Sequence, residues 1–271
     1  MRHIAPRSGR VLLWIYGGIV FTFLMAPIVA IMPLSFNSEP FFTYPMPGFS
    51  LRWYEEFFNS PSWRLAAFNS IVVAVASTIL ATSLGTLAAL GLSRSDCPFR
   101  RTLTAFLISP IIIPIVVAAL GIFYFYSRIG LVASLTGLVI AHAALGAPFV
   151  VVTVLATLSG FDMRVMRAAA SLGASPTTAF RLVMLPLIAP GVAAGAIFAF
   201  VTSFDEVVVA LFLSGSEQRT LPRQMWSGLR EQISPTITAV STLLILLAAI
   251  LMTVSNVLQA RSPRTKTTQQ A

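Results

Sequence analysis

Six long stretches without Lys or Arg constrain this chain more than any other feature, and only one of them contains acidic residues. The hydrocarbon core of a membrane is about 30 Å thick, and an α-helix needs about 20 residues to cross it. Each stretch exceeds that length, and none alternates with the period of two that marks a membrane β-barrel strand. The sequence therefore predicts an all-α polytopic membrane protein. Its six predicted transmembrane helices are 11–36, 65–92, 102–127, 129–158, 187–213 and 237–258.

The composition agrees with a chain that is solvated largely by lipid. Charged residues make up 10% of the sequence, against about 25% in an average soluble domain, and 56% of the residues are hydrophobic. The net charge of +9 would suggest a nucleic-acid partner in a soluble protein. Here the orientation rule for membrane helices explains the charge, so no nucleic-acid partner is predicted. Cys97 is the single cysteine and can form no internal disulfide.

The distribution of Lys and Arg predicts the side of the membrane on which each end lies. If segment 1–10 is cytoplasmic, the segments on its side carry twelve of the 18 Lys and Arg residues. Cytoplasmic segments of membrane proteins carry the excess of these residues. The sequence therefore predicts that segment 1–10 and the tail 259–271 are both cytoplasmic. In the outer loop 37–64, aromatic residues four apart at 53–58 predict an interfacial helix.

The cytoplasmic loop 159–186, between the fourth and fifth predicted spans, has the signals of two short helices. Asp162 suits the N-cap of the first helix, and Gly173 suits the left-handed position just past its end. Ser175 caps the second helix, and Pro176 takes its first position, where the missing N–H costs nothing. A plain connector needs fewer than about ten residues and no such caps. We therefore interpret the loop as a surface for a partner.

The same loop resembles the cytoplasmic "EAA" loop of type I ABC importer permeases. The pattern of that family is Glu-Ala-Ala, three residues, Gly, nine residues and Ile-x-Leu-Pro. This chain has Arg167-Ala168-Ala169, then Gly173, then Val183-Met184-Leu185-Pro186, with every spacing kept. The resemblance implies the type I (MetI-like) transmembrane fold over 65–258 and a coupling helix that sits in a cleft of a cytoplasmic ATPase. The implied coupling residues are Arg167, Ala168, Ala169, Gly173, Leu185 and Pro186.

One residue of this loop departs from the family pattern. The family's Glu is Arg167 here. A contact that a carboxylate would make to a basic group on the ATPase therefore cannot be carried over. The shape of the loop agrees with the family, and its charge does not.

Other segments look like the C-type permeases of spermidine/putrescine importers, namely 35–37, 49–54, 148–153 and 203–209. The resemblance implies a permease subunit, not an enzyme, in the bacterial inner (plasma) membrane. Its implied partners are a second (B-type) permease, a dimer of ABC ATPase subunits and a periplasmic solute-binding protein. The chain has no Gly-x-x-x-x-Gly-Lys-Ser/Thr loop to cradle phosphates. We therefore expect it to bind no cofactor, with ATP and Mg²⁺ held by the partner ATPase.

Asp205 and Glu206 are the only charged residues within a predicted span. A charge at mid-bilayer costs about 2.5–3.5 kcal/mol on insertion scales, so a pair that faces lipid is disfavoured. Thr202 and Ser203, one turn below, add hydroxyls to the same sector. Three interpretations stay open. The pair attracts a cationic solute near the outer gate, pairs with Arg or Lys of the companion permease, or is exposed to water.

Prolines and small residues predict where the spans bend and pack. Pro114 is one of several prolines that suggest kinks or span ends, which neighbouring helices can tolerate. Gly191 and Gly195 have the GxxxG spacing, a frequent pattern that allows close helix approach.

Other functions would leave different traces in the sequence. A self-contained secondary carrier usually shows internal repeats and paired intramembrane charges, and we find no convincing repeat at half length. An intramembrane enzyme would need a nucleophile and a base, or a metal cluster. His142 has no metal-ligand spacing around it, so we interpret it as a hydrogen-bonding interior residue and predict no catalytic or metal site. By resemblance the solute is a polyamine, with another small organic cation, an amino-acid derivative or a metal complex as alternatives.

Overall fold

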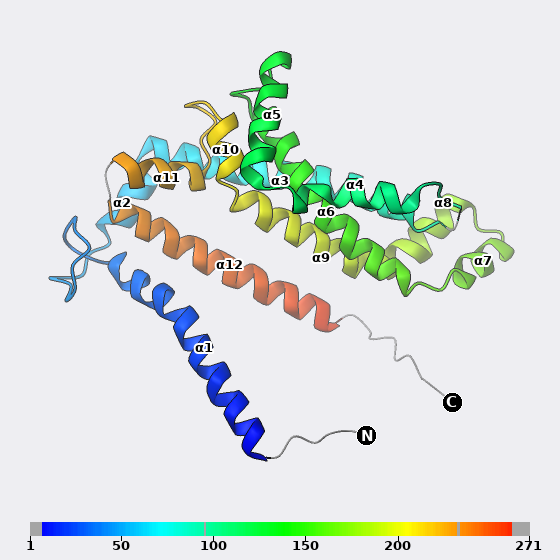
Figure 1. Cartoon of the computed structure of the whole chain (residues 1–271), viewed down its shortest axis with the longest axis horizontal. Helices are drawn as coiled ribbons and strands as arrows, with labels where there is room; N and C mark the ends of the chain where they lie inside the picture. Colours follow the sequence, from blue (N-terminus) through cyan, green and yellow to red (C-terminus); the bar gives the residue numbers. More distant parts are fainter. Residues whose placement is uncertain (1–6, 95, 232–233, 262–271) are drawn as a thin grey trace. The chain divides into compact units, whose positions relative to one another are not determined.

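The computed structural model describes residues 7–94, 96–231 and 234–261, which form helices joined by loops (Figure 1). Within these ranges, extended pairing is limited to one isolated bridge between Asn37 and Phe49. The all-α class is thus confirmed for the part of the chain that the structure describes. The outermost parts of the predicted cytoplasmic ends, residues 1–6 and 262–271, lie outside the described residues.

The chain divides into two compact units, residues 1–60 with 227–247 and residues 61–226 with 248–271. In chain order the elements are α1 (Arg7–Leu34), α2 (Arg52–Asn59), α3 (Pro61–Leu92), α4 (Arg100–Ile112), α5 (Ile115–Ile129), α6 (Leu135–Ser159), α7 (Arg164–Ser171), α8 (Pro176–Ala179), the π-helix η1 (Phe180–Met184), α9 (Leu185–Phe204), α10 (Val208–Leu213), α11 (Leu221–Glu231) and α12 (Thr236–Arg261).

In the first unit, the loop after α1 is fastened to α2. The indole Nε1 of Trp53 donates to the carbonyl of Asn37 at 2.6 Å, and the hydroxyls of Ser35 and Tyr54 lie 2.7 Å apart. Trp53 is buried, whereas Phe58 is exposed. The helix predicted around residues 53–58 is therefore present, with one aromatic face turned inward. Its interfacial position stays a prediction.

The second unit has a core of three helices, α3, α6 and α9, which pack against one another. The approach of α9 to α6 depends on glycine. A Cβ on Gly195 would lie 2.5 Å from Thr153 Oγ1 and 2.9 Å from Val150 Cα. A Cβ on Gly191 would lie 2.8 Å from the Cβ of Thr157. The GxxxG pair therefore packs within the chain, against α6.

The apolar helices agree in part with the predicted spans. Among the residues that the structure describes, four segments are long and apolar enough to cross a membrane: Val11–Leu34, α3, α6 and Pro176–Phe204, which joins α8, η1 and α9. The pair α4 and α5 gives a fifth if it counts as one span. The apolar part of α12 found among the described residues, Thr236–Ile250, is shorter. The number six stays a prediction.

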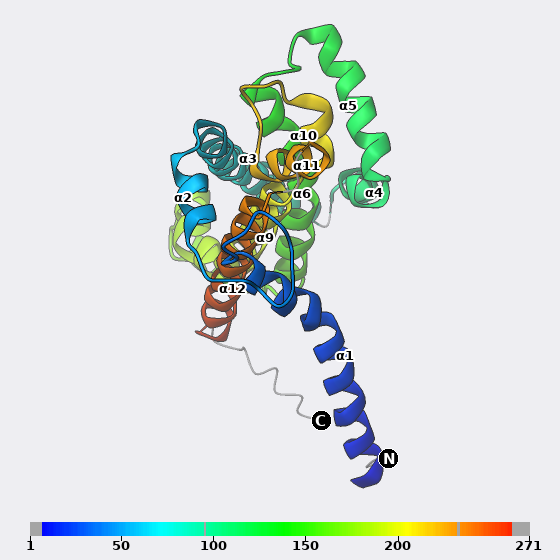
Figure 2. The same ribbon diagram turned by 90° about the vertical axis from the view of Figure 1, so that its left-hand side faces the viewer.

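The predicted span 102–127 is interrupted at Pro114, one of the prolines predicted to kink or end a span. The two halves, α4 and α5, meet at an angle of 103°, and Figure 2 shows α5 turning away from α4. Ile113 is extended, with φ −69° and ψ 130°. A proline clashes with a helical conformation of the residue before it, so α4 ends at Ile112 and Pro114 becomes the N-cap of α5.

Candidate functional sites: the 159–186 loop and the break after α9

Asp162 stabilises the start of α7 from the position just before the N-cap, whereas the sequence predicted it as the N-cap itself. The N-cap is Met163, which has no side-chain cap. The Asp162 carboxylate accepts the backbone N–H of Arg164 at 2.9 Å and the Nε–H of the same residue at 2.9 Å. The backbone hydrogen bond, joined by the Arg164 side chain, holds the pKa of the Asp162 carboxyl below its usual value. The predicted cap role is thus confirmed in function and corrected in position.

The end of α7 confirms the left-handed glycine. Gly173 has φ +83°, a region that favours glycine because it has no Cβ. The Gly173 N–H donates to the carbonyl of Ala170 at 3.0 Å, and the Ala174 N–H donates to that of Ala169 at 3.1 Å. This pair of bonds is the Schellman motif. It turns the chain sharply and leaves Leu172, which is 90% exposed, at the corner.

The second helix of the loop also begins as predicted. The Ser175 hydroxyl accepts the N–H of Thr178 at 3.3 Å, and Pro176 takes the first helical position. The chain then passes through η1, where the N–H of Leu185 donates to the carbonyl of Phe180, five residues back. Single-turn π-helical segments occur often at functional sites. Pro186 follows in the first turn of α9.

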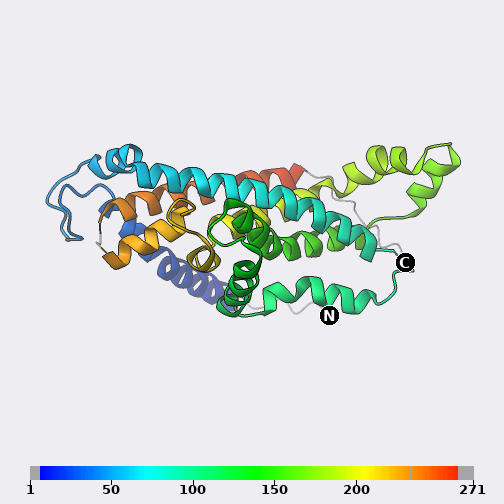
Figure 3. The same cartoon turned by 90° about the horizontal axis from the view of Figure 1, so that it is seen from above.

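The loop is anchored to the core on one side and exposed on the other. Phe161, Met166 and Phe180 pack against a buried cluster in α3, α6 and α9. Arg167 and Ala168 are exposed on the other side of α7. Figure 3 shows the yellow-green segment of α7 and α8 projecting beyond the ends of α3 and α9. Of the predicted coupling residues, the structure places Arg167, Ala168 and Ala169 on α7, Gly173 at the turn, and Leu185 and Pro186 at the start of α9.

The acidic pair lies in a break, not within a continuous helix as predicted for 187–213. The helix α9 ends at Phe204, and α10 begins at Val208. The Glu206 Oε1 accepts the N–H of Val209 at 2.8 Å, so this half-buried carboxylate supports the start of α10. Asp205 is exposed. The two acids therefore have different surroundings, which their adjacency in the sequence did not predict.

Ser203 belongs to the core and not to the exposed surface of the break. Its hydroxyl lies 2.9 Å from the Ser77 hydroxyl on α3 and 2.9 Å from His142 Nδ1 on α6. Both Ser203 and His142 are buried. This placement corrects the prediction that Ser203 shares a sector with the acids, and it confirms His142 as a hydrogen-bonding interior residue. Thr202 is half-buried.

A second polar connection, absent from the sequence prediction, fixes the loop between α10 and α11. Asn69 on α3 is buried, and its Nδ2 donates to the carbonyls of Glu217 at 2.8 Å and Arg219 at 3.0 Å. The adjacent Ser70 hydroxyl accepts the N–H of Leu221 at 2.7 Å. The available signal was Asn-Ser inside an apolar stretch, because buried polar side chains find hydrogen-bond partners.

The sequence matches a family model over residues 81–266, which cover the end of α3, the core helices α6 and α9 and the 159–186 loop. That model describes a "binding-protein-dependent transport system inner membrane component".

Full-length relatives extend the match beyond that region. The chain is 32% identical over 244 residues to the spermidine/putrescine transport system permease protein PotC of Haemophilus influenzae, covering 90% of this chain and 95% of that protein. It is 32% identical over 251 residues to the putrescine permease PotI of Escherichia coli, with 90% and 89% covered. The molybdenum transport system permease protein ModB of Mycobacterium bovis is 33% identical over 212 residues, with 72% and 79% covered.

A solved structure shares the fold at low sequence identity. A chain of the bacterial alginate ABC transporter, solved with an alginate pentasaccharide-bound periplasmic protein, superimposes with a TM-score of 0.71 and 16% identity. The match covers 95% of each chain. This likeness supports the type I permease fold that the 159–186 loop led us to expect.

Proposed function

Because this chain belongs to the family of binding-protein-dependent transport system inner membrane components, we propose that it forms half of the translocation path for a small cationic solute of the polyamine class. It is a permease subunit of an ABC importer in the inner membrane. It is not an enzyme, and ATP hydrolysis belongs to a separate ATPase subunit. Transport proceeds by alternating access driven by that hydrolysis.

The observation that carries the coupling role is the geometry of α7. A helix of eight residues is held at its start by the Asp162 carboxylate, which accepts the N–H of Arg164, and is closed at its end by the Schellman turn at Gly173. Its outer side combines the small Ala168 with the almost fully exposed Leu172. A short rigid helix with little bulk and one apolar corner suits insertion into a groove of a partner. The proposed partner surface is the cleft of a cytoplasmic ATPase dimer.

The presence of Arg167 in place of the family's Glu constrains the charge of the ATPase surface that this residue can contact. Arg164 is paired with Asp162 at 2.9 Å, whereas no described carboxylate lies within ion-pair distance of Arg167. Its charge therefore faces the proposed partner, which cannot offer the basic group that a family Glu would contact. A second permease and a periplasmic binding protein complete the proposed assembly. In this proposal six spans place both termini and α7 in the cytoplasm.

The proposed solute contact is Asp205. Glu206 is engaged with the backbone of α10, which leaves Asp205 as the exposed carboxylate of the pair. The carbonyl end of α9, which carries partial negative charge, adjoins it. Both features favour a cation at the break. The polyamine class follows from the names of PotC and PotI, whereas the similar identity to a molybdenum permease keeps another solute, such as a metal complex, as the alternative.

Reconstitution of the chain with its partner subunits in proteoliposomes tests the proposal. Uptake of labelled spermidine or putrescine should require ATP, the ATPase and the periplasmic binding protein together. Molybdate and an amino acid serve as comparison solutes. Polyamine uptake by this chain alone, without ATP, would contradict the subunit role and favour a secondary carrier. Coupled uptake of another solute in place of polyamines would replace only the solute class.

A further inference from the structure

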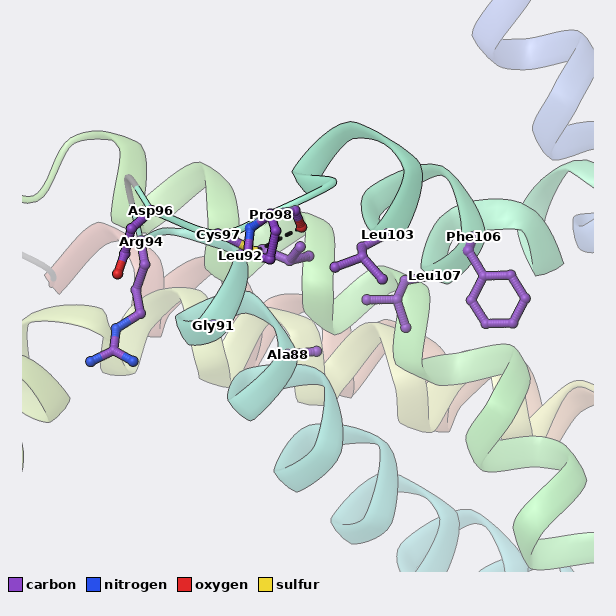
Figure 4. Close-up of a pocket in the computed structure, with 10 residues that line it drawn as sticks. All are labelled: Ala88, Gly91, Leu92, Arg94, Asp96, Cys97, Pro98, Leu103, Phe106 and Leu107. Carbon is purple, nitrogen blue, oxygen red and sulfur yellow. Dashed lines mark hydrogen bonds between the residues drawn. The ribbon is translucent and has the colours of Figure 1, made fainter.

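A cavity of about 560 Å³ lies between the end of α3 and the first turns of α4 (Figure 4). Its wall is mostly apolar. The residues that line it are Ala88, Gly91, Leu92, Leu103, Phe106 and Leu107 on the helices, with Arg94, Asp96, Cys97 and Pro98 on the connection. Neither the coupling loop nor the break after α9 contributes a residue. The cavity is therefore separate from both sites described above.

The cavity has space that the chain itself does not fill. A Cβ added to Gly91 would meet no atom within 4 Å. Phe106 and Leu103 of α4 are exposed. The volume is within the range of about 300–1,000 Å³ that is typical of ligand sites in proteins. In a membrane protein, the molecules available to fill an open apolar groove are lipid chains and neighbouring helices.

The charges at one end of the cavity favour a lipid with an anionic headgroup. In Figure 4 the side chains of Arg94 and Asp96 lie at the end of the cavity opposite Phe106. No ion pair joins Arg94 to Asp96, although the structure describes both residues. Arg100 and Arg101 begin α4 just beyond the lining residues and are exposed, so basic groups outnumber the acid here. Arginine binds phosphate oxygens through paired N–H donors.

We propose that this cavity binds an anionic glycerophospholipid, with an acyl chain along Gly91, Leu103 and Leu107 and the phosphate at Arg94. The arrangement follows the two ends of the cavity, because a phospholipid has an apolar chain next to a charged phosphate. Basic pockets between membrane helices bind anionic headgroups in the same way. The inference stands apart from the solute and from the coupling role of α7.

Cys97 provides a native probe, because it lines the cavity and is the single cysteine. The full chain, with its co-purifying subunits, is placed in nanodiscs of phosphatidylcholine alone or with phosphatidylglycerol. A soluble maleimide then measures the reactivity of Cys97. When free anionic lipid reaches about ten times its Kd, the unoccupied fraction, and with it the labelling rate, should fall about tenfold. Equal rates in the two nanodiscs would overturn the proposal.

Two variants separate the headgroup from the chain. Arg94→Gln should abolish the difference between the nanodiscs, whereas Arg128→Gln, an exposed arginine in the last turn of α5, should keep it. Gly91→Leu should occupy the apolar part, since a Cβ at this position meets nothing within 4 Å, and native mass spectrometry should then detect loss of bound phosphatidylglycerol. Retention of the lipid by both Arg94→Gln and Gly91→Leu would overturn the proposal.

Protection of Cys97 by the companion permease regardless of lipid would also overturn it, because the cavity would then be a subunit interface. None of these readouts measures transport. A failure here therefore leaves the proposed importer function intact, and a failed uptake assay leaves the lipid site intact.

Discussion

The Nδ1 atom of His142 on α6 lies 2.9 Å from the hydroxyl and 3.1 Å from the carbonyl oxygen of Ser203 on α9. The last carbonyls of a helix lack partners within the helix, and α9 ends one residue after Ser203. With its proton on Nδ1, His142 satisfies one of these carbonyls. The Ser77 hydroxyl reaches the same serine at 2.9 Å. This buried junction of α3, α6 and α9 lies directly before the break that carries Asp205.

Ser203→Ala should destabilise the chain. Removal of the hydroxyl takes one hydrogen bond from both Ser77 and His142, which keep the carbonyls of Ala74 and Ser203, so the expected loss is about 0.5–1.5 kcal/mol for each hydrogen bond. Ser83→Ala, an exposed serine of α3, is the matched control and should be neutral. Denaturant unfolding in detergent measures both variants. Parental stability of Ser203→Ala would show that the junction contributes little.

Gly195→Ala should also destabilise the chain, although alanine is the better helix former. The new Cβ would lie 2.9 Å from the backbone Cα of Val150, which cannot rotate away. Overpacking of this kind costs about 1–3 kcal/mol. Gly121→Ala in α5 is the control, because a Cβ there meets nothing within 4 Å. The two variants should shift the unfolding midpoint in opposite directions, and a shared direction would contradict the close packing of α9 on α6.

Gly173→Val should weaken binding of the ATPase while the chain still inserts into the membrane. A Cβ at this position meets nothing within 4 Å, so the penalty comes from the backbone, whose φ is +83°. A left-handed conformation costs about 1–2 kcal/mol for an ordinary residue, and more for a β-branched one. Gly173→Asn is the control, because asparagine tolerates this region. Co-purification of the ATPase measures the outcome. Normal ATPase binding and transport in the valine variant would reduce the loop to a connector.

Asp205→Asn should reduce polyamine uptake, whereas Glu206→Gln should have a smaller effect because its Oε1 can still accept the N–H of Val209. At an effective dielectric near 20, loss of one charge contact removes at most about 4 kcal/mol. A tenfold loss of rate requires about 1.4 kcal/mol and is therefore within reach.

Uptake in proteoliposomes and co-purification of the companion permease, measured side by side, separate the three interpretations of the pair. Failure of the Asp205→Asn variant to assemble would make the residue an interface contact. Uptake at the parental rate would leave the carboxylate merely exposed to water.

Thiol labelling should establish the topology. In a Cys97→Ser background, Arg10→Cys and Ser262→Cys should react only from the cytoplasmic side, and Glu217→Cys only from outside. The expectation rests on the twelve Lys and Arg residues assigned to the cytoplasmic segments. Labelling of either terminus from the outside would overturn the six-span arrangement.

The features that could be predicted correctly depend on residues close together in the chain. Helix caps and turns involve neighbours within about six residues, so Ser175, Pro176 and Gly173 revealed the form of the 159–186 loop. Pro114 likewise marked the bend between α4 and α5 by its effect on the residue before it. The N-cap was predicted one position too early, at Asp162, because an aspartate can also accept the N–H two residues on from outside the helix, as it does with Arg164.

The sequence by itself therefore determined that the chain is an all-helical membrane protein and how its 159–186 loop is capped. It marked Pro114 as one of several candidate bends, while the span 102–127 was predicted as one segment. Only the tertiary structure showed that Ser203 is buried in the core, because its hydrogen-bond partner Ser77 is 126 residues away in the sequence. The same holds for Asn69, which fixes the loop between α10 and α11 through the carbonyl of Glu217, 148 residues along the chain. Which of two adjacent acids stays exposed depends on where α9 breaks. Long-range packing and hydrogen bonding determine the residue at which α9 ends, and these contacts cannot be predicted from a periodic pattern in the local sequence.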